Sequence, residues 1–339
     1  MAHEITITGA GGLLGGSMYE HLKKSGENVI GTTLTIESEI AQKLGFKRLD
    51  TSDLEATKKF VWDNLPNTFY HFAGIARPGL VNEKPELGEK VNIGGVLNLF
   101  EAIEEGKKKD NSYSPVIIAA GSVEEFGDAP LAKDNNPITI IESTPKNPLN
   151  IYAEQKKLAG ELAFDLSRKY KTKLIWIYEG QATGVSENRD ISQEKGYFVP
   201  DIASQIAAFE KNVQDGKVSP VEPQILRTGV IGHKRNFIDV RDAVKAYVAI
   251  AKESNLPSDD FIVCADKSVT LKEILDILIN HSVVPIIHEI DKSRGAGAGV
   301  DRYYSNQKIK SAANWKPEIP LEETLRLVLE YQRKLAGVK

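Results

Sequence analysis

A glycine-rich turn near the start of the sequence constrains the fold of this chain more than any other feature. A predicted strand at Glu4–Thr8 runs straight into a helix through glycines at 9, 12 and 15. Without Cβ atoms, Gly9 and Gly12 let the backbone bend sharply and approach a pyrophosphate, which would bind the free N–H groups and positive dipole end of the helix. Gly15 lets the helix pack close to the strand. The turn predicts a nucleotide-binding unit, although such turns also occur as plain tight connections.

The first half of the chain then alternates strands with helices, a pattern that predicts a parallel, doubly wound α/β sheet of the Rossmann type. The second half loses this rhythm and carries longer loops, so it predicts a smaller, discontinuous α/β unit packed over the sheet edge. We expect the dinucleotide-binding domain over 1–178 and about 237–255, and the substrate-binding domain over 179–236 and about 256–339. Further strands are predicted near Val29–Thr32, Phe46–Leu49, Thr68–Ala73, Val116–Ala120 and Leu174–Tyr178.

Composition fits a cytoplasmic enzyme and argues against several other classes. With 41% hydrophobic residues the 339-residue chain can build a proper core, and a net charge of −4 gives no nucleic-acid footprint. No apolar run approaches the ~18 residues of a membrane span, and the first segment is a strand rather than a signal peptide. The single cysteine, Cys264, stands in an apolar run and should be buried. None of the six histidines has a metal-ligand spacing, so no metal site is predicted.

A tyrosine and a lysine supply the predicted proton chemistry. Tyr152 and Lys156 are four residues apart, so on a helix they face the same small volume. A fixed cation favours phenolate, so we expect Lys156 to lower the pKa of Tyr152 and make it a general acid or base. Ser122 follows the strand before this helix, at the edge where ligands bind in open α/β sheets. The pair alone is ordinary helix surface, and its position in this pattern is what indicates catalysis.

Together these features resemble the extended short-chain dehydrogenase/reductases that act on nucleotide sugars. The similarity covers nearly the whole chain and is greatest to the GDP-4-keto-6-deoxy-D-mannose reductases, with the GDP-mannose 4,6-dehydratases next. Beyond the glycine turn and the Tyr-Lys pair, it is carried by four segments: GSVEEFG at 121–127, GYFVPDIASQI at 196–206, RNFIDVRD at 235–242 and NWKPEIPLE at 314–322.

The resemblance implies a nicotinamide dinucleotide cofactor. The second strand ends in Thr32 and Thr33, without the acidic residue that would bind an adenosine ribose, so NADP(H) is favoured over NAD(H), although no arginine follows where the reductases often have one. Asp50 and Thr51 resemble the pair that holds adenine, with helix capping as an equal alternative for Asp50. The other implied cofactor residues are Gly9, Gly12, Leu13, Leu14, Gly15, Phe72, Ala73, Gly74, Tyr152, Lys156 and Asn92, which should brace the active-site helix.

By resemblance, the catalytic residues are Ser122, Tyr152, Lys156 and Glu124. In the reduction of a ketone, Ser122 would hold the carbonyl oxygen, Tyr152 would protonate it and Lys156 would bind the nicotinamide ribose. The role of Glu124 stays open. Its counterpart in the dehydratases moves a proton at C5 during loss of water, similar reductases carry it too, and it could be a partly exposed loop carboxylate.

A nucleotide-sugar diphosphate needs cations or backbone donors, and Arg235 and Arg294 are the predicted ligands, with surface salt bridges as the alternative. The resemblance also implies that Ser122, Gln181 and Val199 contact the substrate. This region departs from the family pattern, because Gln181 replaces an asparagine and Arg294 is followed by glycine and alanine where the family has Arg-Pro-x-Glu. The nucleobase and the sugar of the substrate therefore stay open, whereas the class of reaction is predicted.

Three functions are expected, in decreasing order. The first is NADPH-dependent reduction of the 4-keto group of a nucleotide-linked 6-deoxyhexose similar to GDP-4-keto-6-deoxymannose. The second is a nucleotide-sugar 4,6-dehydratase or epimerase, in which the cofactor is recycled and Glu124 is essential. The third is a non-catalytic dinucleotide-binding regulator, disfavoured because the serine, tyrosine and lysine are all present. The resemblance also implies a homodimer, or a tetramer, in which helices near Leu87–Glu105 and Tyr152–Tyr170 pack against their copies.

Overall fold

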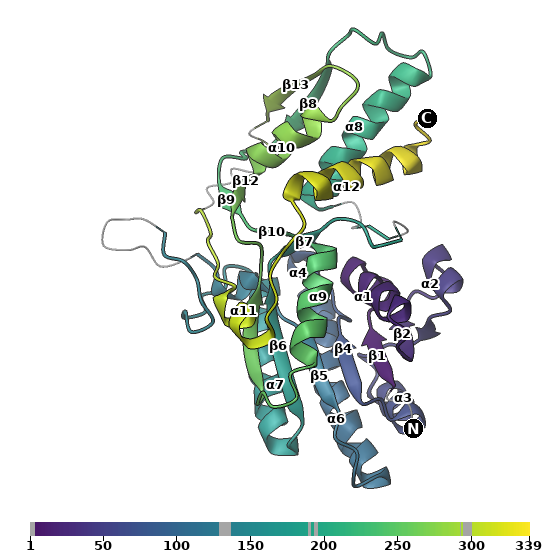
Figure 1. The fold of residues 1–339 in the computed structure, drawn as a ribbon, viewed down its shortest axis with the longest axis vertical. Helices are drawn as coiled ribbons and strands as arrows, with labels where there is room; N and C mark the ends of the chain where they lie inside the picture. Colours follow the sequence, from purple (N-terminus) through teal and green to yellow (C-terminus); the bar gives the residue numbers. More distant parts are fainter. Residues whose placement is uncertain (1–3, 129–136, 189–190, 193–195, 292, 294–299) are drawn as a thin grey trace.

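The computed structural model describes residues 4–128, 137–188, 191–192, 196–291, 293 and 300–339. A larger unit is built on a seven-stranded parallel sheet, and a smaller unit stands over its carboxyl edge (Figure 1). The strand order β11-β6-β5-β4-β1-β2-β3 reverses beside β1, as in a doubly wound sheet, so the predicted fold class is confirmed. The strands are β1 (Ile5–Thr8), β2 (Val29–Thr33), β3 (Lys47–Arg48), β4 (Thr68–His71), β5 (Val116–Ala120), β6 (Lys173–Glu179) and β11 (Asp259–Val263).

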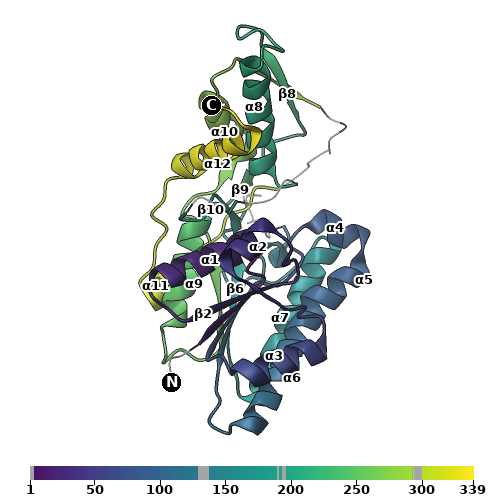
Figure 2. The ribbon, with the colours of Figure 1, turned by 90° about the vertical axis from the view of Figure 1, so that its right-hand side faces the viewer.

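Helices cover both faces of this sheet, so successive side chains of a strand pack in two separate cores (Figure 2). In β5, Ile117 belongs to the core under α6 and α7, whereas Ile118 belongs to the core under α1 and α9. Burial on both faces explains the unbroken apolar sequence VIIAA of this strand. The helices are α1 (Leu13–Lys24), α2 (Glu39–Leu44), α3 (Leu54–Asn64), α4 (Pro78–Glu83), α5 (Pro85–Gly88), α6 (Gly94–Lys109), α7 (Ile151–Tyr170), α9 (Val240–Ala251) and α11 (Gln307–Ala313).

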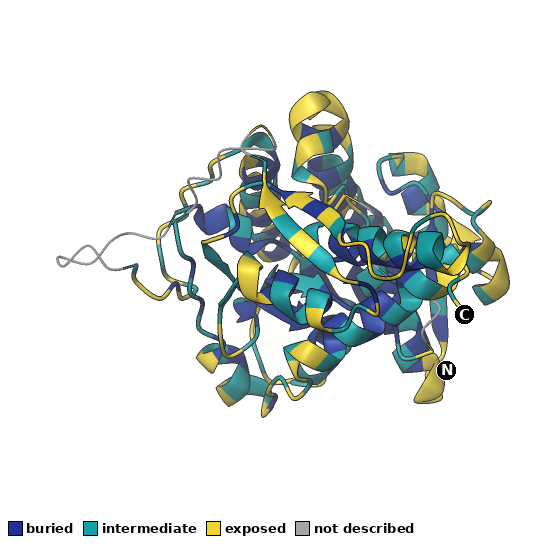
Figure 3. Cartoon of the chain, turned by 90° about the horizontal axis from the view of Figure 1, so that it is seen from above, coloured by how far each residue is buried: buried dark blue, intermediate teal, exposed yellow. Residues whose placement is uncertain are grey.

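The smaller unit has its own hydrophobic core. Three helices, α8 (Phe198–Gln214), α10 (Leu271–Asn280) and α12 (Leu321–Ala336), enclose it, and α12 brings the end of the chain back against α8. Short strand pairs complete the unit and join it to the larger one: β7 (Gln181–Thr183) with β10 (Phe237–Asp239), β9 (Lys234–Arg235) with β12 (Val269–Thr270), and β8 (Gln224–Thr228) with β13 (Ile286–Ile290). Exposed residues follow the outer faces of the helices (Figure 3).

The predicted end of the dinucleotide-binding domain, near residue 255, is one strand too early. Strand β11 pairs with β6 at the edge of the main sheet, and α11 packs on α9 and β11. The reason is that α9 carries the chain back along the sheet, and a parallel strand follows such a crossover. Two aspartates open β11, which shortens its apolar signal in the sequence. Cys264, directly after this strand, is fully buried as predicted.

The predicted helix near Leu87–Glu105 is interrupted, because a single π-helical turn, η1 (Glu89–Ile93), separates α5 from α6. Such turns are rare and often lie at functional sites. The helix predicted at Tyr152–Tyr170 forms α7 in full. Assembly through these helices stays a prediction. Within the described ranges, no helix has the length and apolar character needed to cross a membrane.

Candidate active site

The glycine turn between β1 and α1 has the backbone shape that the sequence predicts. Gly9 has φ +72°, and a Cβ atom there would lie 2.6 Å from the backbone nitrogen of the chain that follows β4. A Cβ atom on Gly15 would lie 2.3 Å from the Gly9 carbonyl oxygen, so only glycine allows this approach of α1. Gly12 is the N-cap, no side chain caps the helix, and Leu13 and Leu14 begin it. The turn therefore fits the diphosphate of a dinucleotide.

The two threonines that end β2 differ in whether their hydroxyl groups are free to bind a ligand. Thr32 is 1% exposed, and its hydroxyl donates to the Ile7 carbonyl oxygen at 3.3 Å. Thr33 lies beside the glycine turn, with its hydroxyl 3.4 Å from that of Thr35. The Thr32 hydroxyl is therefore already bonded inside the sheet, and contact of either threonine with the cofactor stays a prediction.

The prediction missed Arg48, a cation near the end of β2. In β3, Arg48 pairs in register with Thr33, and its guanidinium lies 3.8 Å from the Glu37 carboxylate in the chain that follows β2. The arginine that the sequence lacks after β2 is thus supplied by the neighbouring strand. The signal was present in the basic end of the third predicted strand, since adjacent parallel strands end at one edge.

Asp50 forms a turn of its own and does not cap α3. Its carboxylate accepts hydrogen bonds from the N–H and hydroxyl groups of Ser52 at 2.9 and 2.6 Å. The N-cap is Asp53, which accepts from a backbone N–H of the first turn at 3.0 Å. The capping alternative for Asp50 is therefore wrong. Thr51 is buried at 4% exposure, and contact of the pair with adenine stays a prediction.

Asn92, in η1, clamps the chain that follows β4. Its side-chain oxygen accepts from the Ile75 N–H at 2.8 Å, and its amide donates to the Ile75 carbonyl oxygen at 3.3 Å. A Cβ atom on Gly74 would lie 3.0 Å from Asn92 Oδ1 and 3.7 Å from Lys156 Nζ. Asn92 therefore fixes the segment Phe72–Gly74 at the sheet edge, while η1 packs against α7.

Ser122, Tyr152 and Lys156 come together between β5 and α7. Ser122 and Tyr152 are 7% and 6% exposed, and their side chains are hydrogen-bonded to each other. Asn150 caps α7 by accepting a hydrogen bond at 2.9 Å, which places Tyr152 in the first turn. One turn later, Lys156 Nζ donates to the Ala120 carbonyl oxygen at 2.9 Å. The three predicted catalytic side chains thus share one volume.

Tyr152 is held as a phenol in this environment. Burial raises its pKa above the ordinary value, and the hydrogen bond with Ser122 opposes this only in part. The expectation that Lys156 lowers the pKa of Tyr152 is therefore wrong. Desolvation by burial has the largest effect on the pKa of Tyr152. It also lowers the pKa of Lys156, whose ammonium donates a hydrogen bond to a backbone carbonyl.

A buried glutamate orients Ser122. Helical turn η2 (Val123–Phe126) starts with a capping box, in which Glu125 accepts from the Ser122 N–H at 3.0 Å. Glu125 is fully buried and also accepts from Trp176 Nε1 at 3.3 Å and from Lys146 Nζ at 2.8 Å. The sequence signal was the spacing Ser-x-x-Glu, which predicts such a box.

Glu124 is paired with an arginine that the sequence reading passed over. Arg302 reaches the site from 178 positions away and donates from Nη1 to Glu124 Oε2 at 2.8 Å and from Nη2 to Asp128 Oδ1 at 3.4 Å. Its side chain is 7% exposed. The Glu124 carboxylate is therefore held in an ion pair, which nothing local in the sequence indicates, and its catalytic role stays a prediction.

Glu179 is a further residue that the prediction missed. It ends β6 and accepts a hydrogen bond from the Tyr247 hydroxyl at 3.0 Å. Burial raises the pKa of Glu179 to about 7, while the hydrogen bond from Tyr247 and the charge of Lys156 act in the opposite direction. Its place at the carboxyl end of a central strand was the available signal.

The predicted substrate residues lie in different settings. Arg235, in β9, donates to two backbone carbonyl oxygens at 2.8 and 2.9 Å, and burial and the neighbouring Arg302 lower its pKa. Gln181 opens β7 and is partly exposed. Val199 is 1% exposed and packs in the core of the smaller unit, so its contact with substrate stays a prediction. Arg294 lies outside the described residues.

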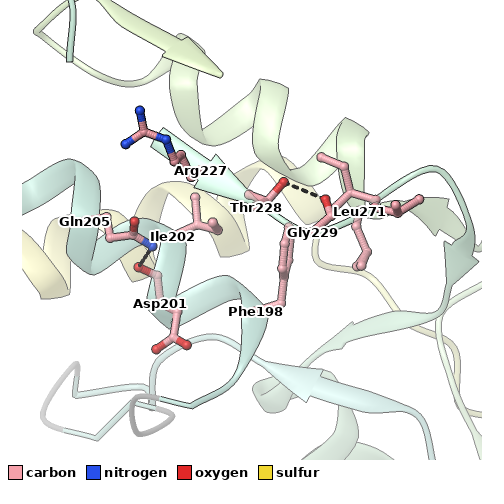
Figure 4. Close-up of a pocket in the computed structure, with 10 residues that line it drawn as sticks. Phe198, Asp201, Ile202, Gln205, Arg227, Thr228, Gly229 and Leu271 are labelled. Carbon is pink, nitrogen blue, oxygen red and sulfur yellow. Dashed lines mark hydrogen bonds between the residues drawn. The ribbon is translucent and has the colours of Figure 1, made fainter. Parts of the chain in front are cut away.

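A pocket of about 320 Å³ opens between α8, β8 and α10 in the smaller unit (Figure 4). Phe198, Ile202 and Leu271 supply apolar walls, and the Gln205 amide donates to the Asp201 carbonyl oxygen at 3.3 Å. Residues from Arg227 to Ile231 line another side of the pocket. Apolar walls with a few convergent polar groups are typical of small-molecule sites. The part of the chain that the structure describes holds no cluster of three metal-ligating side chains.

Comparison with known proteins assigns the chain to a family. Residues 5–264 match the NAD dependent epimerase/dehydratase family. GDP-6-deoxy-D-mannose reductase of Pseudomonas aeruginosa is 24% identical over 79% of this chain and 81% of its own length. GDP-mannose 4,6 dehydratase 1 of Arabidopsis thaliana is 24% identical over 85% and 73%.

Solved structures agree on the fold. The structure of RMD from Pseudomonas aeruginosa complexed with NADPH superposes with a TM-score of 0.78 at 20% identity over 99% of both chains. A UDP-glucose-4-epimerase from Stenotrophomonas maltophila with bound NAD and formylated UDP-arabinopyranose superposes with a TM-score of 0.82 at 16% identity over 99% and 100%. The chain belongs to the NAD dependent epimerase/dehydratase family and is an NAD(P)-dependent enzyme of the extended short-chain dehydrogenase/reductase type.

Proposed function

We propose that this protein reduces the 4-keto group of a nucleotide-linked 6-deoxyhexose with NADPH. The observation that carries the proposal is the buried group of Ser122, Tyr152 and Lys156 at the carboxyl edge of the sheet. Reduction of a ketone needs a proton donor at the carbonyl oxygen, and the Tyr152 phenol beside Ser122 can supply that proton.

The side chains divide the work between orientation and proton transfer. Ser122 donates a hydrogen bond to the substrate carbonyl oxygen, and Tyr152 transfers its phenolic proton to that oxygen as the alcohol forms. NADPH supplies the hydride when it is bound. Lys156 lies one helical turn from Tyr152, where its ammonium would bind the nicotinamide ribose. Glu125 keeps Ser122 in place through its backbone N–H.

Four groups would hold the cofactor. The N-terminus of α1 and the glycine turn take the diphosphate. Asp50 and Thr51 would bind the adenine end of the cofactor, and Tyr152 and Lys156 would bind the nicotinamide ribose. Thr33 and Arg48 lie where a 2′-phosphate is expected, and their charge and hydroxyl favour NADPH over NADH.

The nucleotide end of the substrate would occupy the smaller unit. Arg235 is half-buried and bonded to backbone carbonyls, so its positive charge remains for a diphosphate. The pocket beside Phe198 and Gln205 suits a nucleobase, with backbone groups of β8 reading its edge. Guanine is favoured by the similarity to GDP-6-deoxy-D-mannose reductase.

Loss of NADPH absorbance on addition of GDP-4-keto-6-deoxymannose tests the proposal, with NADH and UDP- or dTDP-linked ketosugars run in parallel. We expect stoichiometric NADPH oxidation that is fastest with the GDP sugar. Conversion of a nucleotide sugar without net NADPH oxidation would instead identify a dehydratase or epimerase, and the absence of any turnover with bound cofactor would favour a regulator.

A further inference from the structure

Arg302 is buried inside the candidate active site and is committed to acidic partners. Its guanidinium donates to Glu124 Oε2 at 2.8 Å and to Asp128 Oδ1 at 3.4 Å. Although burial disfavours a charged guanidinium, the charges of Glu124 and Asp128 raise the pKa of Arg302 above its ordinary value. Among the described residues, its Nε atom is buried without a hydrogen-bond partner. The guanidinium therefore depends on its contact with Glu124.

Glu124 faces the reacting group. It stands two residues after Ser122, its N–H donates to the Ser122 hydroxyl at 3.2 Å, and its charge is close enough to raise the pKa of Tyr152. A ketone at C4 makes the C5 hydrogen acidic, so a free carboxylate here could remove that proton and start elimination. A carboxylate paired with a buried arginine is a poor base, since its protonation would leave Asp128, at 3.4 Å, as the remaining acidic partner of the arginine among the described residues.

We propose that Arg302 determines the reaction outcome by holding Glu124 as an ionised acceptor for the sugar, which suppresses removal of the C5 proton. This inference rests on the proposed ketosugar reduction. Without Arg302, the Glu124 carboxylate takes the C5 proton, the C5–H electron pair moves toward the C4 carbonyl to form an enolate, and a solvent-exchanged proton returns to C5. Arg302 is a positioning residue, because it acts through Glu124.

Solvent exchange at C5 tests this role without requiring reduction. The full-length protein with NADP⁺ is incubated in D₂O with GDP-4-keto-6-deoxymannose, and mass spectrometry follows deuterium entry. We expect the wild type to exchange no faster than buffer, Arg302→Leu at least tenfold faster, and Arg302→Leu combined with Glu124→Gln at the buffer rate. Arg302→Lys, which keeps the charge, should stay near the wild-type rate, and Arg326→Leu on α12 is the matched control.

Exchange by Arg302→Leu at the wild-type rate, or exchange that survives in the double variant, would overturn the inference. Reduction assays with NADPH on the same preparations separate failure of this inference from failure of the proposed function. A wild type that reduces the ketosugar, with no faster exchange in Arg302→Leu, refutes the role of Arg302 alone. If the wild type neither binds nor reduces the ketosugar, the proposed function fails and the inference falls with it.

Discussion

The two halves of the candidate site are built in different ways. The cofactor side consists mostly of backbone shaped by short segments, such as the turn from Gly9 to Gly15 and the loop that Asn92 clamps. The substrate side depends on charged side chains from distant segments, of which Arg302 with Glu124 is the clearest case. Backbone sites tolerate little change in shape, whereas charge pairs can be retuned by one substitution. A family with one cofactor and many sugar chemistries can be built in this way.

Tyr152→Phe should produce the largest effect, because it removes the only group here proposed to protonate the substrate. We expect ketosugar reduction to fall by about 10²- to 10⁴-fold. The Kd for NADPH should change much less, because Lys156 and the glycine turn still hold the cofactor. Stopped-flow absorbance gives the rate and fluorescence titration the Kd. Tyr170→Phe at the other end of α7 is the control. A variant that loses cofactor binding and activity together would contradict the view that the cofactor side and the substrate side work independently.

Gly15→Ala tests the claim that the cofactor side depends on backbone shape. The added Cβ would lie 2.3 Å from the Gly9 carbonyl oxygen, so α1 must shift. Overpacking of this kind costs about 1–3 kcal/mol of unfolding free energy, and affinity for NADPH should fall with it. Urea denaturation measures the first effect. Gly79→Ala, where nothing lies within 4 Å of the new Cβ, should change neither quantity.

Glu179→Gln should change how stability depends on pH. Burial raises the folded-state pKa of Glu179 from 4.5 to about 7, so the folded protein binds this proton more tightly than the unfolded chain does. The residue therefore costs nothing below about pH 4.5, and its cost grows as the pH rises to about 7 and then persists. At pH 8 the variant should gain roughly 1–2 kcal/mol, since partial solvent contact reduces the full effect. The same gain in urea melts at pH 4.5 would contradict this assignment.

Arg48→Leu should give the smallest effect and sharpen the comparison, because it removes a charged side chain from a cofactor side that is built mostly of backbone. We expect the Kd for NADPH to rise about tenfold, equivalent to ~1.4 kcal/mol, and the Kd for NADH to stay unchanged. Isothermal titration calorimetry with NADPH and with NADH distinguishes loss of 2′-phosphate recognition from a general loss of cofactor binding. Equal weakening of both would mean that Arg48 does not read the 2′-phosphate.

Sequence reasoning anticipated the elements of the cofactor side because they are local. A strand, three spaced glycines and a helix specify the turn from Gly9 to Gly15, and a four-residue spacing puts Tyr152 and Lys156 on one face of α7. It failed where burial decides. Lys156 was expected to lower the pKa of Tyr152, whereas desolvation raises it, and β11 was expected outside the main sheet.

The sequence by itself therefore determined the doubly wound fold, the phosphate-binding turn and the identity of the proposed acid–base group, because these follow from periodicity and spacing within a few tens of residues. Only the tertiary structure decided that Arg302 binds Glu124, that Arg48 lies beside Thr33 and that Glu179 is a partly buried acid near Lys156. These contacts join segments that only the packed sheet brings together, and in that low-dielectric setting the pairing of each charge is set by what else is buried with it.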